Sequence, residues 1–157
     1  MKIFDATAII AFLSEMECPD SLVELAKHYE LIVPEGVAAE IRKEPGRGHL
    51  RNLSRRGIVN IVQVDQNLVK KIQNEHPQLH QGECEAIAFV ESHSGPKKTC
   101  IVSDDSKARK IFQKLNFKWT ERLLDIMKEK GLIDPSKYDE KMAKLAESPF
   151  YSRSRTQ

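Results

Sequence analysis

The chain has 157 residues, of which 40% are hydrophobic and 31% are charged. This length accommodates one domain with a sizeable core, and the composition excludes a disordered chain. The 25 lysine and arginine residues nearly balance the 23 aspartate and glutamate residues. Any nucleic-acid surface must therefore come from local segregation of charge.

Membrane and secretory classes are disfavoured as well. No apolar run approaches the roughly 18 residues of a membrane span, and Asp5 interrupts the early apolar segment that a secretory signal would need. We therefore expect a cytoplasmic protein. Cys18, Cys84 and Cys100 lie far apart, without a Cys-x-x-Cys pair, which indicates neither a disulfide framework nor a zinc site. We expect buried thiols at least for Cys84 and Cys100, which lie in apolar surroundings.

The first elements alternate between strand and helix. Residues 2–7 predict a strand, and the apolar run 8–13 continues as a buried helix. Asp5 thus lies where a strand gives way to a helix, and ligands and catalytic groups collect at such positions in open α/β sheets. Capping of the helix is its alternative role. A second helix, which Pro19 and Asp20 open and which runs through residues 21–28, and a short buried strand over 31–33 follow.

The next segment carries an acid and many arginines. After a turn at residues 35–36, a helix over 37–43 places Glu40 beside its apolar face, where an exposed glutamate is the ordinary alternative. Residues 46–57 predict a mobile loop or a short exposed helix. They contain Arg47, Arg51, Arg55 and Arg56, which either remain solvated or contact phosphate.

The middle of the chain contains a nearly all-apolar helix. Residues 58–64 predict a third strand, and Asp65 caps a helix over 66–75. The helix over 81–91 then begins with Glu83 and Glu85. Both acids suit the helix dipole. Because the helix is apolar nearly all round, its N-terminus is expected to face something other than bulk water, and a cation is the simplest candidate.

The last third repeats the arrangement at Asp5. A turn at 94–98 precedes a fourth strand over 99–103, and Asp104 and Asp105 follow it directly. Two adjacent aspartates repel each other unless a cation or hydrogen bonds offset the repulsion. The remaining expected elements, within a single domain of residues 1–150, are a helix over 107–115, a strand over 117–119, helices over 120–131 and 135–149, and a frayed basic tail over 151–157.

Alternating strands and helices predict an α/β fold with a central, mostly parallel sheet that is covered on both faces. In such a sheet Asp5 and Asp105 can converge, and Glu40 and Glu83 can lean over the same edge. Four carboxylates around one crevice do not readily stay ionised together without a divalent cation. Ligands that offer only oxygen select Mg²⁺ or Mn²⁺ rather than zinc.

Four segments together resemble the PIN-domain nucleases, the family of the VapC toxins, and specifically archaeal or bacterial members with glutamate in the third acidic position. They are residues 4–7, 37–41, 82–88 and 101–109, and the ending over 124–133 is similar too. The resemblance implies a three-layer α/β/α PIN-like fold and metal-dependent endonucleolytic cleavage of RNA. A divalent cation would activate water for in-line attack, without a side-chain nucleophile.

The resemblance also implies roles for individual residues. The acids that bind the metal and carry out catalysis are Asp5, Glu40, Glu83 and Asp105, with Asp104 as an additional ligand and Thr7 and Ser103 as hydroxyls beside the metal. Glu85 competes with Glu83, although the helix register favours Glu83. Residues that would position the phosphate backbone are Arg47, Arg51, Arg55, Arg56, Lys107 and Arg109.

Two other α/β classes fit less well. A haloacid-dehalogenase-type phosphatase needs a second acid where this chain has Thr7, and a response-regulator receiver has its acidic pair near the start. A PIN scaffold that binds RNA or a protein partner without cutting remains as the alternative. The family also implies a homodimer, and the small single domain suggests the toxin of a toxin–antitoxin pair, bound by a small antitoxin protein.

Overall fold

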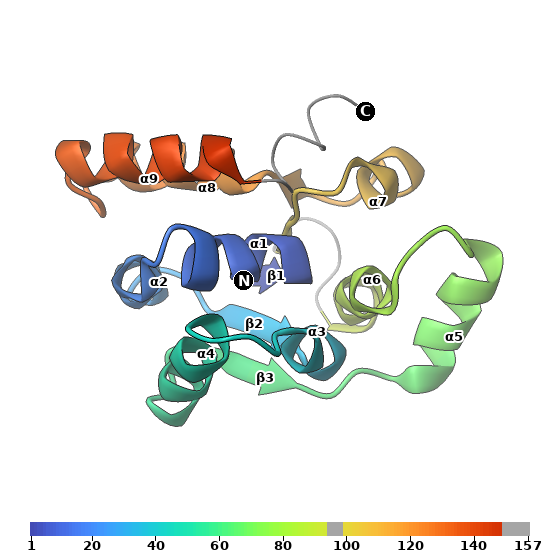
Figure 1. Cartoon of the computed structure of the whole chain (residues 1–157). Helices are drawn as coiled ribbons and strands as arrows, with labels where there is room; N and C mark the ends of the chain where they lie inside the picture. The colour runs from blue at the N-terminus through green and yellow to red at the C-terminus, as the bar shows by residue number, and fades with distance from the viewer. Residues whose placement is uncertain (94–98, 149–157) are drawn as a thin grey trace.

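A computed structural model describes residues 1–93 and 99–148 of the chain. Within these ranges five strands form one sheet in the order β3-β2-β1-β4-β5, and every neighbouring pair is parallel (Figure 1). The strands are β1 (Lys2–Phe4), β2 (Leu31–Pro34), β3 (Asn60–Val62), β4 (Cys100–Val102) and β5 (Phe117–Lys118). The mostly parallel sheet that the sequence predicts is thus parallel at each described pairing.

Helices connect these strands and cover the sheet. They are α1 (Ala6–Ile10), the π-helix η1 (Ala11–Glu15), α2 (Pro19–Ala26), α3 (Glu35–Glu40), α4 (Gly46–Arg55), α5 (Gln66–Glu75), α6 (Gln81–His93), α7 (Ser106–Ile111), α8 (Thr120–Glu129) and α9 (Pro135–Glu147). In Figure 1 the arrowheads of β2 and β3 point toward α3 and α6. The carboxyl ends of the strands therefore face this group of helices.

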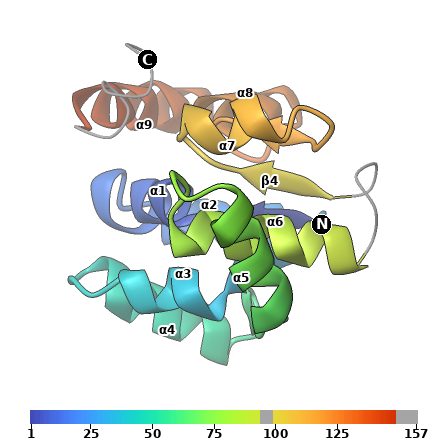
Figure 2. The same cartoon turned by 90° about the vertical axis from the view of Figure 1, so that its right-hand side faces the viewer.

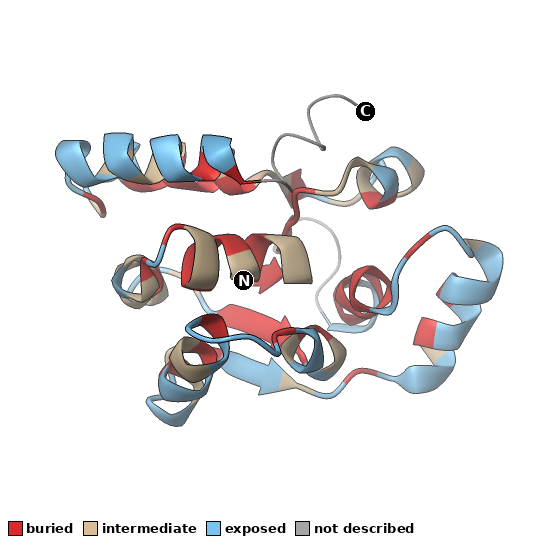
Figure 3. Cartoon of the chain, viewed as in Figure 1, coloured by how far each residue is buried: buried red, intermediate tan, exposed pale blue. Residues whose placement is uncertain are grey.

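The two faces of the sheet bury different helices. Successive strand residues point to opposite faces, so Ile3 and Ile101 join a core with α5, α6 and α7, whereas Phe4 and Val102 join a core with α1, η1, α2, α8 and α9. Figure 2 shows α5 lying across α6, and Figure 3 shows α6 buried along most of its length. The predicted three-layer α/β/α architecture is confirmed.

Several predicted boundaries are wrong for local reasons. The first strand ends at Phe4 rather than at residue 7, because Asp5 caps α1 by accepting a hydrogen bond from the Ala8 amide. The apolar run after it is α-helical only as far as Ile10. It continues as the π-helix η1, in which the Met16 amide donates to the Ala11 carbonyl at 2.8 Å.

Other differences come from tertiary packing. The arginine-rich stretch, for which the sequence left a mobile loop and a short exposed helix open, is the ten-residue helix α4, and Leu50 and Leu53 bury its inner side. The expected turn at residues 35–36 is the first turn of α3. The helix expected over 107–115 ends at Ile111, since Phe112 leaves the helical region at φ −104° and ψ 55°.

Other local predictions hold. Helix α5 begins after Asp65, whose side chain accepts from the Asn67 amide at 2.9 Å, and the three cysteines are buried. Among the helices of residues 1–93 and 99–148, none combines the length and hydrophobicity that a membrane crossing requires. The turn expected at 94–98 and the tail expected at 151–157 lie outside the described residues.

Candidate functional site

The carboxyl ends of β1 and β4 bring the predicted acids together. These strands are parallel neighbours, and the Asp5 amide donates to the Val102 carbonyl at 3.1 Å. A cavity of about 70 Å³ opens at this edge. It is lined by Asp5, Ala6, Thr7, Glu40, His80, Gly82, Glu83 and Asp105. The four acids that the sequence singles out therefore line one cavity, although they come from four separate segments of the chain.

Asp5 is held at the start of α1 and is only 3% exposed. Its Oδ1 accepts hydrogen bonds from the Thr7 hydroxyl at 2.7 Å and from the Ala8 amide at 3.0 Å. Burial raises the pKa of Asp5 to about 7, while hydrogen bonds from Ser103, Ala8 and Thr7 oppose that rise. The two predicted hydroxyls, Thr7 and Ser103, thus both act on this carboxylate.

Glu83 lies in the first turn of α6 and is 7% exposed. Its Oε2 accepts from the His80 amide at 2.8 Å, whereas Oε1 is buried with no hydrogen-bond partner among the described residues. The pKa of Glu83 is raised to about 7, mainly by burial and in part by the nearby charges of Asp105 and Glu40, while the hydrogen bond from His80 opposes the rise. A cation beside Oε1 would relieve both effects.

Glu40 reaches the cavity from the last turn of α3, and its carboxyl pKa is raised mainly by burial. The absence of a side chain at Gly82 makes room for it. A Cβ on Gly82 would lie 2.8 Å from Glu40 Oε1 and 3.0 Å from Val37 Cγ2. The contact with Val37 is tight, and the contact with Glu40 Oε1, at the free end of a flexible side chain, would force that carboxylate to move. The glycine therefore permits Glu40 to occupy this position.

Asp105 lines the cavity and also caps a helix, as Asp5 does. Its Oδ1 accepts from the Lys107 amide at 2.7 Å and caps α7, and its own amide donates to the Ser103 hydroxyl at 3.1 Å. Because capping fixes each aspartate at a helix start, both carboxylates are positioned by the backbone rather than by long flexible side chains.

Comparison with known proteins agrees with this geometry. A family model described as PIN domain matches residues 1–156. The chain belongs to the PIN-domain family. Neither the curated proteins nor the solved structures gave a match. PIN domains are generally nucleases and generally use divalent metal ions, so a nuclease-type hydrolase is the activity that the family supports for this chain.

Two further acids of this PIN domain lie next to the cavity but do not line it. Both oxygens of Glu85 are occupied, since Oε2 accepts from the Gly36 amide at 2.8 Å and Oε1 accepts from Gln81 Nε2 at 3.0 Å. Asp104 is 5% exposed and its Oδ1 accepts from the Thr120 amide at 2.8 Å. Glu85 ties α6 to α3, and Asp104 ties β4 to the start of α8.

The six predicted phosphate-binding residues separate into four places. Arg47, Arg51 and Arg55 line a different groove, between α3, α4 and β3. Lys107 is exposed, and its charge lowers the pKa of Glu83, so it lies near the acids. The guanidinium of Arg109 stacks 3.9 Å from the centre of the Trp119 ring, which gives this arginine a packing role.

Arg56 stands apart from the other arginines of its segment. Its Nη1 donates to Asn52 Oδ1 at 3.3 Å on the exposed side of α4, and it does not line the groove. Sequence reasoning also missed His80, which lines the acid cavity and binds Glu83 through its backbone. Its position three residues before the first acid of a buried helix was the signal available.

The donor chemistry of this PIN domain fits a hard divalent cation, since four carboxylates line the cavity and one buried oxygen has no partner. As the side chains stand, no three His, Cys, Asp or Glu groups within residues 1–93 and 99–148 are placed to hold a metal ion. Like charges without a counter-ion keep apart. Binding of one cation by three or more of these acids thus requires side-chain movement from the positions seen here.

Proposed function

We propose that this protein is a Mg²⁺- or Mn²⁺-dependent endoribonuclease of the PIN type, with the acid cavity as its catalytic centre. The observation that carries the proposal is the cavity itself. Asp5, Glu40, Glu83 and Asp105 line it together, and Glu83 Oε1 is buried there without a hydrogen-bond partner.

The four acids of the cavity and the residues around them have different parts in the proposed chemistry. The four carboxylates would hold the divalent cation, which when bound activates water for attack on a phosphodiester and stabilises the developing charge. Thr7 and Ser103 orient Asp5 through their hydroxyls. The caps made by Asp5 and Asp105 fix two of the ligands before substrate arrives. Asp104 supports the site from the start of α8 rather than as a ligand.

The biological role that we propose is that of a VapC-like toxin acting on RNA in the cytoplasm, with a small antitoxin protein as partner and a homodimer as the active assembly. The four segments that resemble the VapC toxins support it, including the glutamate at the third acidic position. Growth arrest on overexpression tests the toxin role. Co-purification of a small protein encoded nearby tests the antitoxin partner, and a dimer mass by light scattering tests the homodimer. Unimpaired growth would count against the toxin role.

The first experiment is RNA cleavage by purified protein. A mixed pool of single-stranded and structured RNA is incubated with Mg²⁺, with Mn²⁺ or with EDTA, for the wild type and for Asp5→Asn. Asp65→Asn is the matched control, because Asp65 caps α5 through the same kind of contact but lies outside the cavity. We expect metal-dependent cleavage in the wild type and the control, and none in Asp5→Asn.

Two outcomes would change this conclusion. Cleavage that persists in Asp5→Asn would place the catalytic centre elsewhere or reveal a contaminating nuclease. Absence of cleavage in every sample, with RNA still bound, would favour a PIN scaffold that binds RNA without cutting it.

A further inference from the structure

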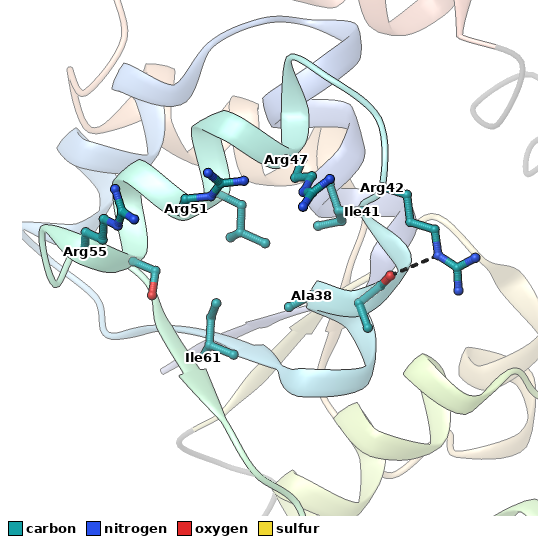
Figure 4. A pocket seen from close by; sticks show the side chains of 10 residues that line it. Ala38, Ile41, Arg42, Arg47, Arg51, Arg55 and Ile61 are labelled. Atoms are coloured by element: carbon teal, nitrogen blue, oxygen red, sulfur yellow. Dashed lines mark hydrogen bonds between the residues drawn. The ribbon is translucent and has the colours of Figure 1, made fainter.

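A second concave feature lies on the other side of α3 from the acid cavity. It is a groove of about 580 Å³ between α3, α4 and β3. Figure 4 shows Arg47, Arg51 and Arg55 in a row along α4, with Ala38 and Ile61 across the opening. The three arginines are four residues apart, so successive side chains leave the helix about 6 Å from one another along its axis.

These arginines have no acidic partner in the part of the chain that the structure describes. No ion pair or side-chain hydrogen bond joins them to another described residue. The residues that line the groove include no aspartate or glutamate. Three unpaired guanidinium groups in one row match a ligand that carries regularly spaced negative charge, and guanidinium is well suited to phosphate oxygens.

The base of the groove is apolar. Ile41 and Leu50 line it as buried residues, and Ile61 lines it from the edge strand β3. Ile61 is 39% exposed, and within residues 1–93 and 99–148 no other large hydrophobic side chain is classed as exposed. A surface that binds only the phosphate backbone of a nucleic-acid duplex does not need an apolar base. Unstacked bases of a single strand do use apolar surfaces and guanidinium planes.

The groove and the acid cavity share the last turn of α3. Ala39 and Ile41 line the groove, whereas Glu40 between them lines the cavity. A flexible polyanion held along α4 would therefore continue past Glu40 to the carboxylates. An acidic peptide also suits arginines above an apolar floor, but it gives no reason for this continuity with the acid cavity.

We propose that the groove between α3, α4 and β3 holds a single-stranded segment of the RNA next to the acid cavity. Arg47, Arg51 and Arg55 contact successive backbone phosphates, and Ile61 contacts an unstacked base. This inference rests on the proposed nuclease function for its ligand, and it adds a binding site that lies outside the catalytic cavity.

The test measures RNA binding in EDTA, where metal-dependent cleavage cannot interfere. A fluorescently labelled single-stranded RNA is titrated with wild type, Arg51→Gln, Arg55→Gln and the matched control Arg56→Gln, which removes the same charge outside the groove. Arg51→Gln and Arg55→Gln are each expected to bind about tenfold more weakly. Each should also reduce the slope of log affinity against log salt by about 0.7. Arg56→Gln should match the wild type.

Ile61→Ala separates the two kinds of contact, because it should weaken binding without changing the salt slope. Equal affinities and slopes for Arg51→Gln, Arg55→Gln and Arg56→Gln would overturn the proposal. So would tighter binding of a duplex of the same sequence. Cleavage assays with metal distinguish the two claims: groove-dependent binding without cleavage refutes the nuclease alone, and cleavage with groove-independent binding refutes the groove alone.

Discussion

Replacing Asp5 with asparagine should stabilise the metal-free protein while it removes activity. The carboxylate is buried at the start of α1, and burial raises its pKa from 3.8 to about 7. Asparagine is nearly isosteric, and its Oδ1 can still accept from the Thr7 hydroxyl and the Ala8 amide. The substitution therefore removes mainly the charge and leaves the cap in place.

The magnitude follows from the pKa difference between the folded and unfolded states. Below pH 3.8 both states carry the proton, so Asp5 has no effect on stability. As the pH rises toward 7 the unfolded state loses the proton first, and each pH unit favours unfolding by about 1.4 kcal/mol. Asp5→Asn should raise the free energy of unfolding by about 2 kcal/mol at pH 5 and by about 4 kcal/mol at pH 8.

Thermal and urea unfolding in EDTA at pH 5 and pH 8 measure this difference. For a chain of this length about 4 kcal/mol corresponds to a rise of roughly 10 °C in melting temperature. Saturating Mn²⁺ should stabilise the wild type more than the variant, because ligand binding to the folded state adds stability. A variant less stable than the wild type at pH 8 would refute the assignment of Asp5 as a destabilised, buried carboxylate.

Three other substitutions and a change of pH have defined outcomes. Glu83→Gln should abolish metal-dependent cleavage without loss of stability. Glu85→Gln should lower the free energy of unfolding by about 1–3 kcal/mol, measured in urea. Both oxygens of Glu85 accept hydrogen bonds, whereas the glutamine amide has one acceptor oxygen and a nitrogen that cannot accept. Gly82→Ala should reduce the cleavage rate at least about tenfold while changing stability little, since its Cβ displaces Glu40. The cleavage rate at low metal concentration should rise with pH through about 7, because protonated Asp5 and Glu83 cannot bind a cation, and excess metal should move that rise to lower pH.

Each of these has a clear contradicting result. Full activity in Glu83→Gln together with loss in Glu85→Gln would reverse the assignment of the third acid. Wild-type cleavage by Gly82→Ala would show that Glu40 does not need its observed position. A cleavage rate independent of pH between 5 and 8 would mean that neither raised pKa controls metal binding.

The convergence of the acids on one cavity could be predicted because two of them follow a strong local signal. Asp5 and Asp105 come directly after apolar strands, and parallel strands necessarily end at one edge of a sheet. Glu83 against Glu85 could not be decided in that way. Both lie at the start of one buried helix, whose register favours Glu83, and in the structure the partners of their oxygens, His80 for Glu83 and Gly36 for Glu85, separate them.

The groove was beyond sequence reasoning for a different reason. Leu50 and Leu53 are the large apolar residues of the basic stretch, so its sequence fits a loop as well as a helix. Packing against η1 and α2 makes it a helix, and the helix then aligns Arg47, Arg51 and Arg55 while turning Arg56 away. The alignment of these arginines could therefore be predicted only once the segment was known to be helical.

The bond from the Gly36 amide to Glu85 offers a way to observe the site without any substrate. Helix α3 has only six residues and no side-chain cap, so alone it would open readily to solvent. Its first turn is held by α6, the same helix that carries Glu83. Hydrogen exchange at the Gly36 amide should accordingly be slow, and its acceleration would report that Glu40 and Glu83 have lost their common support.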